Sequence, residues 1–91
     1  MTAHTDAARV HALATILFQK EVWHADAAQA LGLDHSELNW IVIEARAGRA
    51  HPVRPEVADA LARAALKRAA LLNEAAQAIQ NAGRRNQLEL L

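Results

Sequence analysis

Five histidines are the side chains of this sequence best suited to metal or proton chemistry, but their spacing does not build a site. His4 and His11 lie two helical turns apart, and His24 lies close to Asp26. A zinc site on a helix needs ligands at i and i+4 and a third ligand elsewhere, and neither feature is present. We therefore expect no metal and ordinary surface histidines.

Other catalytic arrangements are also missing from the sequence. There is no cysteine, which excludes disulfides, thiolate metal ligands and a cysteine nucleophile. The sequence has no glycine-rich phosphate loop, no carboxylate pair in an evident cleft and no activated serine. We expect a protein that is not an enzyme and that uses no cofactor.

Compartment and charge narrow the possible partners. The absence of cysteine, of a signal-like N-terminus and of an 18-residue apolar window predicts a soluble, cytoplasmic chain with no membrane partner. Net charge is zero, but residues 1–45 hold six acidic and two basic side chains, and residues 46–91 hold four acidic and eight basic ones. Such asymmetry is typical of a chain with a face for nucleic acid.

Length and composition predict one all-α domain over residues 1–91. A chain of 91 residues buries a single small core. About a quarter of the residues are alanine and aromatic residues are few, which favours closely packed helices and no sheet. We expect a small helix-turn-helix domain of four or five helices with a long C-terminal helix.

The segment over about 24–47 predicts two short helices joined by a tight turn. The first helix ends at Gly32, because glycine adopts the left-handed backbone at low cost. The second is capped by Asp34 or Ser36 and continues to about residue 47. Its spacing predicts an inward face of Leu38, Ile41, Val42 and Ala45 and an outward face of Ser36, Asn39, Trp40 and Ile43.

Helices are also expected on both sides of this segment. Thr5 or Asp6 caps a first helix of about 14 residues, and Trp23 fills the junction that follows it. The residues GRAHPVRP, 48–55, break the chain because two prolines favour extended backbone. A long helix over about 55–82 then stops at Gly83, and the tail RRNQLELL is either a loose end or a leucine hook onto a partner.

The long helix has more apolar surface than so small a domain covers. At 1.5 Å per residue, roughly 25 residues of helix span about 38 Å. We therefore expect it to form a homodimer interface, although Arg68 interrupts the heptad and gives no clear coiled coil. The expected interface residues are Leu61, Ala65, Leu72, Ala76 and Ile79.

The segment 24–47 resembles the helix-turn-helix of Cro and lambda-repressor-like DNA-binding regulators. The residues that carry the resemblance are Ala28, Gly32, Leu33, Ser36, Leu38 and Asn39, and the stretch HPVRPEVADALARA resembles later helices of such headpieces. In that family the second helix enters the major groove and its exposed side chains touch base edges. The resemblance implies base contacts by His35, Ser36, Asn39 and Trp40, and phosphate contacts by His24, Arg46, Arg49 and Arg54. Arg63, Lys67 and Arg68 would add phosphate contacts if the long helix lies near the DNA backbone.

Some of the side chains at these positions are better suited to contact DNA than others. Asn39 can pair with adenine through two hydrogen bonds, and Ser36 or His35 can donate or accept. Trp40 departs from the pattern, because it has one donor and a large apolar surface. Asp34 and Glu37 repel phosphates.

Two functions follow from these observations. The first is a small homodimeric transcriptional regulator of bacterial or phage type that binds double-stranded DNA, with the two reading helices about 34 to 36 Å apart. The second is a phage-type helical interaction protein that inhibits or adapts a host protein through Trp40 and Ile43. An exposed Trp40 keeps the DNA interpretation open, and a Trp40 buried in a dimer removes the reading face.

Overall fold

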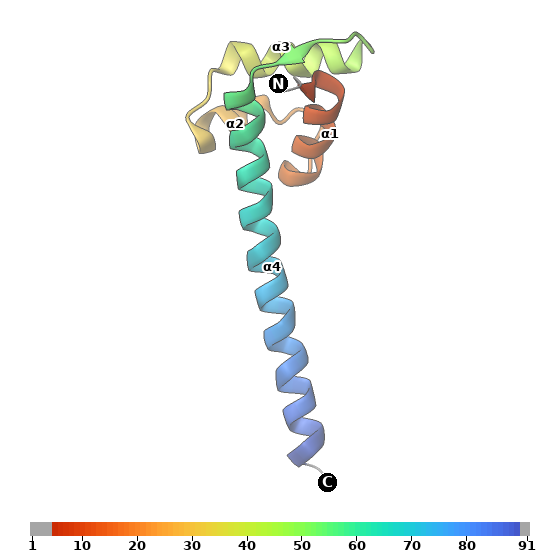
Figure 1. The fold of residues 1–91 in the computed structure, drawn as a ribbon, viewed down its shortest axis with the longest axis vertical. Helices are drawn as coiled ribbons and strands as arrows, with labels where there is room; N and C mark the ends of the chain where they lie inside the picture. The colour runs from red at the N-terminus through yellow and green to blue at the C-terminus, as the bar shows by residue number, and fades with distance from the viewer. Residues whose placement is uncertain (1–4, 90–91) are drawn as a thin grey trace.

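The computed structural model describes residues 5–89 and consists of a headpiece and a projecting helix (Figure 1). In this part of the chain the elements are β1 (Thr5–Asp6), α1 (Ala7–Phe18), α2 (His24–Leu31), α3 (His35–Arg46), β2 (Pro52–Val53) and α4 (Pro55–Glu89). The headpiece comprises α1, α2, α3, the strands and the start of α4. Most of α4 extends away from it, so the molecule measures 59 by 30 by 25 Å. The expected all-α fold with a long C-terminal helix is confirmed.

The helices of the headpiece begin and end close to the expected residues. Asp6 caps α1, since its carboxylate accepts a hydrogen bond from the backbone N–H of Arg9 at 3.1 Å. Gly32 ends α2 with a φ of 66°. Asp34 caps α3 by accepting from the backbone N–H of Glu37 at 3.0 Å. Asp34 therefore takes the role that the sequence left open between it and Ser36.

A single apolar core holds these helices together. Trp23 is fully buried and fills the junction between α1 and α2, as expected. Its indole Nε1–H donates to Nδ1 of His11 at 2.9 Å. His11 is thus a half-buried acceptor and not the ordinary surface residue that was expected. The remaining core residues are Ala7, Val10, Ala14, Ala27, Leu38, Ile41, Val42, Val53, Val57 and Leu61.

The expectation of no sheet is wrong in one small respect. β1 and β2 pair antiparallel, with Thr5 opposite Val53 and Asp6 opposite Pro52. The backbone N–H of Ala7 also donates to the carbonyl of His51 at 2.8 Å. The residue before a proline avoids the helical region, so this segment is extended and its free backbone groups pair with the N-terminal residues.

The predicted end of the long helix at Gly83 is wrong, because α4 continues to Glu89. Gly83 has no positive φ. A glycine inside a helix costs about 1 kcal/mol relative to alanine, and the alanine-rich turns before it and the Arg, Gln, Leu and Glu residues after it favour continuation of the helix. Residues 84–89 of the expected tail are therefore helical, and its last two residues, 90 and 91, lie outside the described residues.

Leu61 is a core residue and not the interface residue that was expected, because none of its surface is exposed. It packs in the headpiece with Val57, where α4 begins. No helix within residues 5–89 combines the length and the apolar character needed to cross a bilayer.

The two glycines Gly32 and Gly83 should respond in opposite ways to replacement by alanine. Gly32→Ala forces a side chain into the left-handed region and should lower the free energy of unfolding by about 1 to 2 kcal/mol in urea denaturation. Gly83→Ala should stabilise α4 locally by about 0.5 to 1 kcal/mol, measured as slower amide hydrogen exchange around residue 83. Neither added Cβ meets another atom within 4 Å, so a change of the same sign at both sites contradicts the backbone assignment.

Candidate functional site

The outward face of α3 is the main candidate surface. Leu38, Ile41 and Val42 are buried in the core, and this turns the opposite side of the helix to solvent. Asn39 and Trp40 lie three and four residues after Ser36, and Ile43 lies four and three residues after them, so the four share that opposite side. Trp40 is 55% exposed and Ile43 is 42% exposed. Ser36 is exposed as well, whereas Asn39 is half-buried.

The two histidines at the starts of α2 and α3 contact each other. The rings of His24 and His35 lie edge to face with centroids 4.7 Å apart. His24 is half-buried, and its Nδ1 is buried without a hydrogen-bond partner among the described residues. His35 remains exposed and available for contact. Their separation in sequence gave no signal of this contact.

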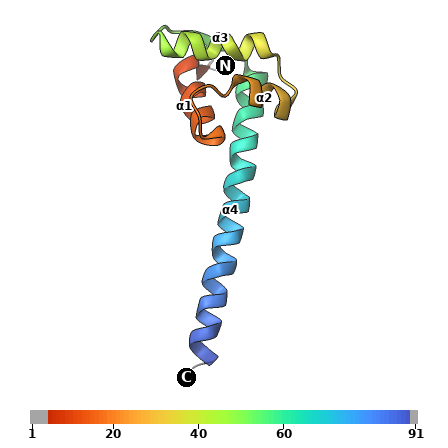
Figure 2. The same cartoon turned by 180° about the vertical axis from the view of Figure 1, so that it is seen from behind.

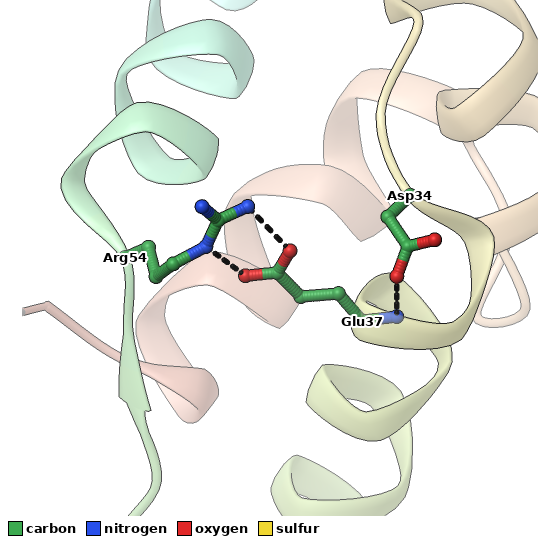
Figure 3. Close-up of polar contacts among 3 residues, drawn as sticks. All are labelled: Asp34, Glu37 and Arg54. Atoms are coloured by element: carbon green, nitrogen blue, oxygen red, sulfur yellow. Dashed lines mark hydrogen bonds and ion pairs between the residues drawn. The ribbon is translucent and has the colours of Figure 1, made fainter.

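Arg54, an expected phosphate ligand, is paired with a carboxylate of α3 (Figure 3). Its Nε and Nη2 donate to the two carboxylate oxygens of Glu37 at 2.6 and 2.7 Å. This two-point geometry is the strong form of an arginine–carboxylate contact. It raises the pKa of Arg54, chiefly through the hydrogen bond to Glu37. The contact joins the residue before α4 to the first turn of α3.

A second ion pair lies at the C-terminal end of α3. Nε of Arg49 donates to Oε2 of Glu44 at 2.7 Å, and Nη2 donates to Oε1 at 3.3 Å. The hydrogen bond from Arg49 lowers the pKa of Glu44 and the same contact raises the pKa of Arg49. Two of the three arginines expected near the reading helix are thus matched by its own carboxylates, while Arg46 is exposed in its last turn.

A groove of about 450 Å³ runs along the same side of α3. Its walls include Trp40 and the carboxylates of Asp34, Glu37 and Glu44, together with Ser36 and His51. His51 reaches the groove from the segment before β2 and was not a predicted site residue. The surface around α3 is therefore close to neutral and not strongly basic.

The basic residues of α4 do not flank α3. The guanidinium of Arg68 donates to the backbone carbonyl of Leu17, near the C-terminal end of α1. Arg63 and Lys67 are exposed on the helix that leads away from α3 (Figure 1). Arg63, Lys67 and Arg68 were expected to contact phosphates only if the long helix lies near the DNA backbone. A duplex lying along α3 would not meet this condition.

The Glu44–Arg49 pair predicts a pH dependence that NMR can measure. The carboxyl carbon of Glu44 should titrate below the ordinary glutamate pKa, because protonation breaks its hydrogen bonds to Arg49. Because the pKa of Glu44 is lower in the folded protein, the pair stabilises the fold at pH values above the ordinary glutamate pKa. This contribution is lost as the pH falls through the pKa of Glu44 in the folded protein. Arg49→Gln should move the titration of Glu44 upward, and an unchanged midpoint contradicts the pairing.

The chain was compared with protein-family models, with curated proteins and with solved structures, and none of them matched it.

Proposed function

We propose that the protein is a small homodimeric helix-turn-helix regulator of bacterial or phage type that binds double-stranded DNA through α3. The observation that carries this proposal is the outward face of α3, where Ser36 and Trp40 are exposed and Asn39 is half-buried between them, while the opposite face of the helix is buried. An α-helix fits the major groove of B-DNA, which is about 12 Å wide.

The side chains on this face match base edges in different ways. Asn39 can donate to and accept from adenine with its amide, and Ser36 can bond to a base or a phosphate. Trp40 offers its apolar ring to a thymine methyl group or a sugar. His35 can donate or accept at the start of the helix, where its exposed ring lies beside His24.

The ion pairs of Arg49 and Arg54 do not prevent phosphate binding. Both arginine side chains are more than half exposed, and solvent screens such pairs, so exchanging the carboxylate for a phosphate costs less than breaking a buried pair would. The carboxylates keep the two arginines beside α3 before DNA arrives. They also limit the positive potential, so we expect moderate affinity with few neutralised phosphates.

Binding should be measured with duplexes selected from a random pool by the purified protein, using fluorescence anisotropy at several salt concentrations. If Arg46, Arg49 and Arg54 each neutralise one phosphate, log K should fall by about 2.7 per unit of log salt for each subunit. Failure to enrich any sequence, together with no binding to random duplex at low salt, overturns the proposal.

Two substitutions should separate base contacts from phosphate contacts. Asn39→Ala should relax preference at one base position by about 1 to 3 kcal/mol, while Arg46→Ala should weaken all duplexes alike and reduce the salt slope by about 0.9. Arg84→Ala, at the far end of α4, is the control with the same charge change and should leave the slope unchanged. An equal loss for Arg46→Ala and Arg84→Ala contradicts a contact centred on α3.

A second function, docking onto a host protein, is favoured by the acidic wall beside Trp40. Asp34, Glu37 and Glu44 line one groove with the exposed indole. A basic side chain in this groove would meet carboxylates and an aromatic face together. This function would make the protein an inhibitor or adaptor of a host protein and would use Trp40 as the anchor of the interface.

A peptide selection against the immobilised protein tests this alternative. It should enrich sequences with Arg or Lys next to an apolar residue, and Trp40→Ala should weaken the selected peptides by at least about tenfold. Ile16→Ala removes an exposed apolar side chain from α1 and is the matched control. Peptides that bind Trp40→Ala as well as the original protein count against the docking function.

A further inference from the structure

One stripe of small and apolar residues runs along α4 at alternating intervals of four and three residues. We call Ala58, Ala62, Ala65 and Ala69 the upper seam. Leu72, Ala76, Ile79 and Gly83 continue the same spacing and form the lower seam. The average interval of 3.5 residues is the repeat of helices that pack along their length. Arg68 lies beside this seam and is drawn to α1 by its hydrogen bond to Leu17.

The upper seam lines an apolar groove beside α1. A cavity of about 290 Å³ lies between Ala65, Ala69 and Leu72 on α4 and Leu13, Ile16 and Leu17 on α1. A second cavity of about 250 Å³ continues past Leu13 to Ala58 and Ala62, and Arg9 and Asp59 also line it. Ile16, on the edge of this alanine groove, is 75% exposed. The groove therefore has room for large side chains, and its walls are mainly apolar, although Gln19 and Arg68 line the first cavity as well.

The lower seam has the opposite character. It begins at Leu72, which lines the end of the groove and is still 62% exposed. It continues along the part of α4 that projects beyond the headpiece (Figure 2), where Ile79 is 74% exposed. One half of α4 thus presents protruding residues, and the other half presents a groove.

We propose that α4 packs antiparallel against α4 of a second copy of the chain, with Leu72 and Ile79 of each copy entering the alanine groove of the other. In this register Leu72 lies opposite Ala69 of the second copy, and Ile79 lies opposite Ala62. The twofold axis passes near residue 70. The proposal rests on the homodimer named above and not on DNA binding.

The sizes of the seam residues decide between antiparallel and parallel packing. In a parallel pair each residue meets its own copy, so alanine layers alternate with layers of two leucines or two isoleucines. The distance between helix axes depends on the side chains at the contact, and one distance cannot suit both kinds of layer without voids or overlap. The antiparallel pair instead opposes large and small residues at the layers of Leu72 and Ile79.

One charged pair beside the seam favours the same orientation. Asp59 and Arg84 each directly follow a seam residue, and about the axis near residue 70 Asp59 lies near the level of Arg84 of the second copy. A parallel pair would place each of these residues at the level of the same residue in the second copy. These exposed side chains contribute little to affinity, but the like-charge levels select against the parallel arrangement.

The area is sufficient for a stable dimer. The seam from residue 58 to residue 83 is about 39 Å long, and a helix contact is about 10 Å wide. Interdigitating side chains bury more surface than the flat contact area, so the pair would bury roughly 600 to 800 Å² of surface per copy. This reaches the standard size of specific interfaces. Contacts between Ile16 and the entering helix add to this area.

This arrangement places the two headpieces at opposite ends of the helix pair. The two α4 helices would begin about 46 Å apart along the axis, at 1.5 Å per residue. That separation exceeds the expected 34 to 36 Å between the two α3 helices. A DNA-bound dimer of this form would contact sites more than one helical turn apart.

The test is the association constant of Ala69→Leu, measured by sedimentation equilibrium without DNA. In the antiparallel pair the enlarged side chain collides with Leu72 of the second copy at two symmetric layers, so we expect at least about tenfold weaker dimerisation. In a parallel pair the same change creates a Leu–Leu layer and strengthens association, which would overturn the proposal. Ala70→Leu, outside the seam, is the control with the same volume and similar helix propensity.

Spin labels give an independent measure of orientation, because the chain has no native cysteine. Labels at Glu56→Cys should be separated by about 45 Å in the antiparallel dimer, and labels at Glu74→Cys should be much closer together. Short distances at both positions, or a monomer at every concentration, overturn the proposal. Duplex binding by Ala69→Leu monomers is measured separately, so failure of this interface is distinguishable from failure of the DNA-binding function.

Discussion

The burial of Leu38, Ile41 and Val42 fixes the orientation of α3, and the properties of the candidate surface follow from that packing. Leu38 has no exposed surface, and the other two have almost none. An α-helix cannot bury both of its sides in a headpiece of three short helices. Trp40 and Ile43 therefore remain at the surface although the sequence of α3 is apolar almost all round.

The ion pairs on this surface have two opposing effects. Glu37 and Glu44 hold Arg54 and Arg49 next to α3, where a phosphate backbone would run. The same carboxylates cancel most of the positive charge and line a groove with Trp40. A strongly basic face would favour nucleic acid alone. With its charge balanced, this face would have to bind DNA through shape and side-chain chemistry, as proposed above, and its carboxylates give a specific reason to consider a basic protein segment as well.

The sequence predicted the local features well and the long-range ones poorly. The turn at Gly32, the cap at Asp34 and the buried positions of α3 follow from backbone geometry and helical spacing, which act over a few residues. The contact of Arg54 with Glu37 joins residues 17 positions apart, and the pairing of Thr5 with Val53 depends on how the whole headpiece closes. Leu61 was misplaced because spacing along α4 shows its apolar side but not where the headpiece ends. Gly83 does not end α4, because the helix propensity of the residues on both sides outweighs the cost of one glycine.

Mapping the amide signals of the labelled protein by NMR during titration with a selected duplex tests the central claim most directly. The account predicts that the signals of residues 35 to 43, together with Arg46 and Arg49, shift in proportion to bound duplex, while those of α4 beyond Leu72 stay in place. Shifts confined to α4, or no shifts at concentrations that saturate binding, would contradict the assignment of α3 as the contact surface.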